Sequence, residues 1–216
     1  MEAPAHTDQV ELFTNWHTWP RTEPELRRLL PAATCDAVAK AVEFAIGYHG
    51  GQRRTTGAPY LEHLLETLEV LVRGAGVTDP AVLSAAVLHD VVEDTPCTAE
   101  DVRLAFGDRV ADMVRWVTKP EPANGADRKA AKESYLKSLM DAPDDAVLVK
   151  LADRASNVQT LRNLGQARQR EYYAQTVRYI IPLAEPRDWW AGWYSLWRAE
   201  HQDLACPVSP AADDRP

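Results

Sequence analysis

The chain has few cysteines and no long apolar run, and each shortage narrows what the protein can be. Its 216 residues include only the three cysteines Cys35, Cys97 and Cys206, with no Cys-x-x-Cys pair. This odd number and wide spacing predict neither a disulfide framework nor a zinc knuckle and are typical of a reducing compartment. No apolar stretch approaches the ~20 residues of a membrane-spanning helix, and the N-terminus lacks the basic start and apolar run of a secretory signal. We therefore expect a cytoplasmic protein.

Acidic residues also outnumber basic residues. There are 24 Lys and Arg against 32 Asp and Glu, which gives a formal net charge of −8. This balance disfavours a broad surface for nucleic acid or for an anionic membrane. A small phosphorylated ligand remains compatible with it, because a metal ion and a few basic residues can neutralise phosphates locally. The expected partner is a small molecule.

The alternating pattern of β-strands is missing as well, while apolar residues recur throughout at helical spacing. The sequence therefore predicts an all-α protein, with helices over about residues 34–49, 60–73 and 168–184 among others. We expect an N-terminal helical extension (1–33), a main domain (34–184), a Trp-rich helix packed on that domain (185–204) and a disordered tail (205–216).

The most informative segment is His89–Thr95, which reads His-Asp-Val-Val-Glu-Asp-Thr and directly follows the apolar run Leu83–Leu88. So apolar a run predicts a buried helix, which does not normally carry several acidic or metal-binding groups in succession. Burying an unpaired carboxylate costs several kcal/mol at least. The carboxyl groups must therefore be paired, protonated or bound to a cation, and a divalent metal would hold this charge best.

Two other predicted helices also place a metal-competent group on an inward face. His49 ends the apolar face of the helix 34–49, and Asp153 lies in the segment Lys-Leu-Ala-Asp-Arg. Alone, each is more often a hydrogen-bonded core histidine or an ion-paired aspartate. Together with His89 and Asp90 they predict a metal site. Two imidazoles and two carboxylates favour Mn²⁺, with Fe²⁺ or Zn²⁺ as alternatives.

Glu93 and Asp94 follow His89 and Asp90 by one helical turn. This spacing places them beside the metal, where a general base that activates water is needed. An exposed acidic helix end is the simpler interpretation of two such residues. Next to a His-Asp pair on a buried helix, the catalytic interpretation is favoured.

Candidate substrate contacts lie on both sides of these residues. Asn157 and Thr160 share a helical stripe with Asp153, which predicts the wall of a pocket or hydrogen bonds to the ligands. Arg53 and Arg54, in a loop rich in Arg and Gly, are the best candidates for phosphate contacts. Further cations close enough in sequence to enter the pocket are Lys40 and Lys150.

The motifs and their order resemble the HD-type hydrolase domain of the RelA/SpoT family over about residues 34–184. The matching segments are His49…Gln52-x-Arg54…Gly57-x-Pro59-Tyr60-x-x-His63, Leu88–Thr95, Phe106-Gly107, Val117-Thr118-Lys119 and Lys150–Asn157. No synthetase segment follows them, so the chain looks like a stand-alone small alarmone hydrolase.

This resemblance implies an all-α HD-domain fold and an Mn²⁺ ion held by His49, His89, Asp90 and Asp153. It implies removal of the 3′-pyrophosphate of (p)ppGpp, which gives GDP or GTP and pyrophosphate. By position, Glu93 and Asp94 would orient and activate the water. The remaining implied contacts are Asn157 and Thr160 with the ribose or base, and Tyr172 and Lys40 with the nucleotide.

Four positions depart from the family's pattern. Thr55 stands where a lysine is usual, Leu64 where a proline is usual, and Ala155 and Ser156 where larger residues are common. These changes keep open a related substrate, such as (p)ppApp, the 2′-phosphate of NADPH or a phosphorylated nucleoside intermediate. A non-catalytic alarmone-binding module is a third hypothesis, disfavoured because the ligand positions and the Glu93–Asp94 pair are all present.

The resemblance does not imply the Trp-rich final helix. Trp189, Trp193 and Trp197 recur there at every fourth position. This spacing is typical of core packing or of a homodimer contact.

Overall fold

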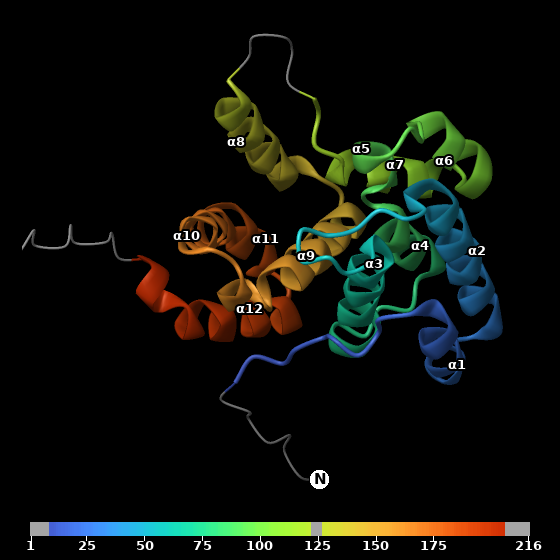
Figure 1. The fold of residues 1–216 in the computed structure, drawn as a ribbon, viewed down its shortest axis with the longest axis horizontal. Helices are drawn as coiled ribbons and strands as arrows, with labels where there is room; N and C mark the ends of the chain where they lie inside the picture. The colour runs from blue at the N-terminus through green and yellow to red at the C-terminus, as the bar shows by residue number, and fades with distance from the viewer. Residues whose placement is uncertain (1–8, 122–126, 206–216) are drawn as a thin grey trace, which may run out of the picture. The chain divides into compact units, whose positions relative to one another are not determined.

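The described part of the chain is built from helices. The computed structural model describes residues 9–121 and 127–205, and within these ranges it contains no β-strand, only an isolated bridge between Arg53 and Pro59 (Figure 1). The predicted all-α fold is confirmed. None of the helices in these ranges combines the length and the apolar character needed to cross a bilayer. Residues 206–216 of the predicted tail and residues 1–8 of the predicted extension lie outside the described residues.

The helices belong to two compact units, one formed by residues 12–157 and the other by residues 158–205 together with residues 9–11. The boundary falls inside the predicted main domain, whose limits stay a prediction. The first unit contains α1 (Trp19–Leu29), α2 (Ala32–His49), α3 (Tyr60–Glu69), α4 (Pro80–Leu88), α5 (Val91–Asp94), α6 (Ala99–Phe106), α7 (Asp108–Val117), α8 (Arg128–Ser138) and α9 (Asp144–Val158), whose last residue reaches the boundary. The second contains α10 (Gln166–Gln175), α11 (Ile181–Ala184) and α12 (Asp188–Glu200).

Helix α4 is the centre of the first unit. Every residue from Val82 to Leu88 is buried, as expected for a helix that is apolar on all sides. It packs against α2, α3 and α7. Asp79 caps its N-terminus by accepting hydrogen bonds from the backbone N–H groups of Ala81 at 2.8 Å and Val82 at 3.2 Å, which satisfies two otherwise unpaired donors. The C-terminal end of α4 consequently delivers His89 into the protein interior.

In the second unit, α12 buries most of its aromatic residues. Trp193 donates its indole N–H to the carbonyl oxygen of Glu11 at 2.9 Å, and Trp197 donates to that of Val158 at 3.0 Å. Both indoles are buried, and a buried indole normally finds such an acceptor. These contacts within the unit favour core packing as the role of the two tryptophans.

The segment before α1 is held to the first unit by the buried carboxylate of Glu69. This carboxylate accepts hydrogen bonds from the backbone N–H groups of Asn15 at 2.8 Å and Trp16 at 3.0 Å, and from the Asn15 side chain at 3.0 Å. Arg73 pairs with it at 2.8 Å. Glu69 is therefore a fully satisfied buried charge with a structural role.

We expect Glu69→Ala to lower the free energy of unfolding by about 2–4 kcal/mol, because it leaves buried donors and an arginine without their acceptor. Urea denaturation followed by circular dichroism measures the change. The control is Glu25→Ala, which removes a half-exposed carboxylate 3.8 Å from the same arginine and should cost less than ~1 kcal/mol. Equal effects of the two substitutions would contradict a structural role for Glu69.

Candidate metal centre

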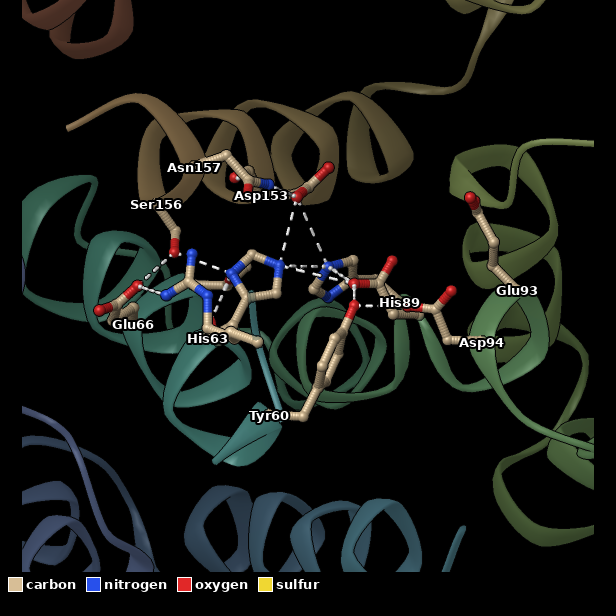
Figure 2. A network of polar contacts seen from close by, with 12 residues as sticks. Tyr60, His63, Glu66, His89, Glu93, Asp94, Asp153, Ser156 and Asn157 are labelled. Carbon is tan, nitrogen blue, oxygen red and sulfur yellow. Dashed lines mark hydrogen bonds and ion pairs between the residues drawn. The ribbon is translucent and has the colours of Figure 1, made fainter. Parts of the chain in front are cut away.

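Four side chains from three parts of the first unit converge in its interior (Figure 2). His63 comes from α3, His89 and Asp90 from the link between α4 and α5, and Asp153 from α9. We call them the His/Asp cluster. The two Nε2 atoms of the histidines lie 3.2 Å apart. Asp90 Oδ2 lies 3.1 Å from His89 Nε2 and 3.5 Å from His63 Nε2, and Asp153 Oδ1 lies 3.6 and 3.5 Å from the same atoms.

The outer nitrogen of each imidazole has a partner of its own. His89 Nδ1 lies 2.7 Å from the carbonyl oxygen of Ala86, and His63 Nδ1 lies 2.9 Å from Ser156 Oγ. A carbonyl oxygen can only accept, so Nδ1 of His89 carries a hydrogen, and in the neutral imidazole the Nε2 lone pair faces the cluster. The atoms of His63, His89 and Asp90 are close enough together to hold one metal ion. The donor set, nitrogen and carboxylate oxygen without thiolate, fits a divalent ion.

The pKa shifts of the residues in the His/Asp cluster also indicate that the cluster needs positive charge. Burial alone raises the pKa of Asp90 and of Asp153, but the histidines, and Lys150 beside Asp153, outweigh it and hold both carboxyl pKa values well below their usual range. Burial alone lowers the pKa of His63 and of His89, but the two aspartates outweigh it and raise both. The buried carboxylates thus demand positive charge, which protons or a metal ion can supply.

Of the four ligands predicted from sequence, His89, Asp90 and Asp153 lie together in the His/Asp cluster, and His63 is an imidazole there that the prediction did not include. His49 as the fourth ligand stays a prediction. His49 is buried as expected. Its Nδ1 lies 2.8 Å from Gln52 Oε1, and its ring stacks on Tyr60 at a centroid distance of 4.7 Å. Its Nε2 has no hydrogen-bond partner, and burial lowers its pKa.

His63 lies on the first turn of α3, which packs directly against α4, so its ring meets His89. Burial of a residue does not fix which neighbour it faces, and the sequence prediction therefore did not include His63 in the cluster.

The predicted acidic pair has two different environments. Asp94 shares the hydroxyl of Tyr60 with Asp90, because Tyr60 Oη lies 2.6 Å from Asp94 Oδ2 and 2.5 Å from Asp90 Oδ2. Glu93 instead pairs with Lys119, accepting from its backbone N–H at 2.8 Å and from its ammonium group at 2.5 Å. Asp94 is therefore linked to the His/Asp cluster through Tyr60, whereas Glu93 is linked to Lys119 in the segment that follows α7.

Two predicted substrate contacts bind Asp153 instead. Asn157 donates its side-chain N–H to Asp153 Oδ1 at 2.6 Å, as foreseen in the alternative of hydrogen bonding to a ligand, and Lys150 donates to Asp153 Oδ2 at 2.8 Å. The Lys150 ammonium also lies over the ring of Tyr135. Both side chains thus orient Asp153 in this structure.

The other predicted contacts are more dispersed. Arg54 pairs with the buried carboxylate of Glu66, and Arg53 is exposed and donates to the carbonyl oxygen of Gly57 at 2.8 Å. Lys40 contacts α6, where its ammonium group donates to the carbonyl oxygen of Ala105. Thr160 and Tyr172 belong to the second unit, and their contacts with a substrate stay predictions.

The fold and the cluster together identify the class of protein. The HD domain family matches residues 41–190, and the chain belongs to this family. Its histidine-aspartate doublet is His89-Asp90, at the end of the buried helix α4.

Proteins of similar sequence show which members of the HD domain family this chain resembles. It is 35% identical over 162 residues to the bifunctional (p)ppGpp synthase/hydrolase SpoT of Escherichia coli K12, covering 74% of this chain and 23% of that protein. It is 36% identical over 172 residues to a GTP pyrophosphokinase of Streptomyces coelicolor, covering 76% of this chain and 20% of the other. The chain thus spans less than a quarter of the length of these relatives.

Two solved structures superpose on this chain. A metazoan ortholog of SpoT, described as hydrolysing ppGpp, superposes with a TM-score of 0.67 at 27% identity and covers 79% of this chain and 97% of its own. A protein of Listeria monocytogenes superposes with a TM-score of 0.52 at 22% identity, covering 67% of this chain and 96% of its own, and shares the fold. The chain is an HD-domain protein homologous to the hydrolase region of SpoT.

We expect His63→Ala to lose most of its bound divalent metal, because His63 directs an Nε2 atom at both aspartates. His49→Ala is measured beside it, because the resemblance implies His49 as a ligand and its buried Nε2 atom has no hydrogen-bond partner among the described residues. The metal-to-protein ratio after dialysis, measured by inductively coupled plasma mass spectrometry, checks this. Circular dichroism confirms that both variants fold. Full metal content in His63→Ala together with its loss in His49→Ala would make His49 the ligand instead.

Metal affinity should fall as the pH is lowered from about 8.5 to 6.5. The raised pKa values of His63 and His89 let them keep protons at a pH where a free imidazole, with a pKa of about 6.5, is neutral, and a ligand must lose its proton before it binds metal. Calorimetric titration with Mn²⁺ at several pH values measures the trend. An affinity that does not change across this range would contradict proton competition at the cluster.

Proposed function

We propose that this protein is a metal-dependent hydrolase that removes the 3′-pyrophosphate from (p)ppGpp, giving GDP or GTP and pyrophosphate. The observation that carries the proposal is the His/Asp cluster with Asp94 linked to it through Tyr60, in a chain homologous to the hydrolase region of SpoT. The proposed partner is a small nucleotide. A cytoplasmic location is part of the same proposal.

The proposed ligands are His63, His89, Asp90 and Asp153, with Mn²⁺ as the first candidate and Fe²⁺ or Zn²⁺ as alternatives. The fit rests on the four acceptor atoms that face one another within 3.1–3.6 Å. Such an ion supplies Lewis acidity and makes water acidic enough to be a nucleophile near neutral pH. His49, the imidazole predicted from sequence, stays the alternative to His63, because its buried Nε2 atom has no hydrogen-bond partner among the described residues.

Asp94 is the stronger candidate for orienting the attacking water. Its carboxylate is exposed, and its Oδ2 atom shares the Tyr60 hydroxyl with Asp90, so it lies one hydrogen bond from the cluster. Water adds to the phosphorus joined to the ribose 3′-oxygen, and a carboxylate placed here can accept a proton of that water. The bond from phosphorus to the 3′-oxygen breaks, pyrophosphate leaves the nucleotide, and the 3′-oxygen takes up a proton from solvent to become a hydroxyl. Glu93 acts next to it by holding Lys119, whose ammonium group supplies positive charge beside the site.

The proposed substrate contacts differ in whether their charged groups are already paired with carboxylates of the protein. Arg53 is exposed and can reach a phosphate, whereas Arg54 and Lys150 are already paired with carboxylates. We propose that Asn157 orients Asp153 and lines the pocket. Contacts of Lys40, Thr160 and Tyr172 with the ribose or base complete the proposal, on the strength of the family resemblance.

A related nucleotide remains the second candidate substrate. Thr55 removes one cation of the usual loop, and the pairing of Arg54 with Glu66 neutralises another. With fewer free cations, binding of a nucleotide with fewer phosphates is weakened less than binding of ppGpp. NADPH, which carries fewer phosphates than ppGpp, tests this argument, and (p)ppApp tests the preference for the base.

The test is a turnover panel with the Mn²⁺-loaded protein on ppGpp, pppGpp, ppApp and NADPH, with product identified by chromatography. The proposal expects GDP or GTP and pyrophosphate, and ppGpp turnover at least equal to that of the others. Faster release of phosphate from NADPH or turnover confined to ppApp would favour the second candidate. Intact nucleotides bound in the presence of metal would point to a binding module.

We expect Asp94→Asn to lower kcat for the best substrate by about 10²–10⁴-fold, because the amide cannot accept the proton of water. Its metal content should stay at the wild-type level, since Asp94 lies outside the proposed ligand set. Asp112→Asn, an exposed substitution on α7, is the matched control and should leave kcat unchanged. Full activity of Asp94→Asn would remove this residue from the mechanism.

A further inference from the structure

One of the two arginines that are candidates for phosphate contacts is paired with a buried carboxylate of α3. Glu66 is 5% exposed, and its Oε2 atom accepts a hydrogen bond from Nη1 of Arg54 at 3.0 Å. The same oxygen accepts the hydroxyl hydrogen of Ser156 at 2.7 Å (Figure 2). The neighbouring Arg53 is exposed and donates to the carbonyl oxygen of Gly57 instead. Two adjacent arginines thus have different electrostatic surroundings.

The backbone of the loop fixes the position of Arg54. Its N–H donates to the carbonyl oxygen of Ala58 at 2.8 Å, and its own carbonyl oxygen accepts from the N–H of Gly57 at 2.8 Å. Gly57 has a φ of +89°, a conformation that glycine adopts without a steric cost. Because the backbone is held in this way, a change of partner for Arg54 requires only a rotation of its side chain.

Arg54 can bind a phosphate while it stays paired with Glu66. Its guanidinium carries five N–H donors, and the bond to Glu66 is made through Nη1. The side chain is 21% exposed, so a ligand can reach it. Ser156, which donates to Glu66, also lies 2.9 Å from His63 of the His/Asp cluster. The phosphates nearest to Arg54 are therefore those at the cluster, where the 3′-group of the proposed substrate reacts.

Stability does not explain a carboxylate at this position. Every residue from His63 to Glu69 on α3 is buried, and burial of an ion pair costs about as much in desolvation as the attraction returns. An apolar side chain of similar size would be equally compatible with the packing. The negative charge of Glu66 consequently indicates a role for the site rather than for the fold.

We propose that Glu66 is a specificity-determining residue, which lowers the affinity of the site for highly charged phosphate groups. It neutralises part of the charge of Arg54 and repels a phosphate bound to the same guanidinium, in a partly desolvated place where charges interact more strongly than in water. A diphosphate is repelled more than a monophosphate. The inference rests on the proposed function and deepens it, because it names the residue that sets the charge preference of that site.

The first experiment measures the KM for ppGpp with the full-length, Mn²⁺-loaded protein. Glu66→Gln keeps the size of the side chain and an acceptor for Ser156 but removes the negative charge. We expect its KM to fall by about 5–50-fold, with the effect on KM rather than on kcat. Glu66→Met, a neutral side chain of similar length, should change the KM in the same direction and provides a second route. An unchanged or higher KM in both variants would overturn the inference.

A comparison with guanosine 5′-diphosphate 3′-monophosphate isolates the effect of phosphate charge, since only the 3′-group differs from that of ppGpp. Its inhibition constant should fall less in Glu66→Gln than the KM for ppGpp does. The matched control is Glu62→Gln, which removes a carboxylate one turn earlier on α3 that lies 3.4 Å from His17, and both constants should stay at the wild-type level. Equal changes of the two constants in Glu66→Gln would refute a role in charge preference.

Arg54→Ala in both backgrounds tests whether Glu66 acts through Arg54. The KM should rise more when Arg54 is removed from Glu66→Gln than from the wild type, because a guanidinium without its carboxylate binds phosphate more tightly. A smaller rise would mean that Glu66 holds Arg54 in place for the substrate, and the inference would be wrong. A wild-type protein that turns over no ppGpp would instead contradict the proposed function, so the two failures are distinguishable.

Discussion

The structure depends on four electron-pair donors that face one another inside the protein. His63 and His89 direct Nε2 atoms, and Asp90 and Asp153 direct carboxylate oxygens, at the same place. In a medium of low dielectric constant such groups repel one another unless a cation or protons lie among them. The helices that supply them are brought together by apolar burial around α4. The fold thus holds these groups close together, and the protons or metal ion that they take up offset their mutual repulsion.

The side chains around the His/Asp cluster donate hydrogen bonds to the carboxylate oxygens of its two aspartates. Lys150 and Asn157 bind the oxygens of Asp153, and Tyr60 binds Asp90. The same contacts extend outward, from Tyr60 to Asp94 and from Ser156 to Glu66. The cations Arg54, Lys119 and Lys150 are paired with carboxylates.

Much of this could be read from local sequence. The apolar run before His89 predicts a buried helix, Asp79-Pro80 predicts its start, and both are found. The position of His89, Asp90 and Asp153 at one site also follows, because each ends or lines an apolar face. The second histidine does not. His49 and His63 are both buried, and burial alone cannot tell which of them lies across from His89.

The sequence by itself determined an all-helical protein with a buried charge cluster, because helical periodicity and the cost of isolated buried carboxylates are local properties of the chain. The HD domain was implied by the resemblance of its motifs to a known family. Only the tertiary structure decided which imidazole joins the cluster, that Lys150 and Asn157 bind Asp153, and that Ser156 connects His63 to Glu66. These contacts join residues up to 93 positions apart. Their geometry depends on how α3, α4 and α9 pack, and no pattern within a single helix encodes that packing.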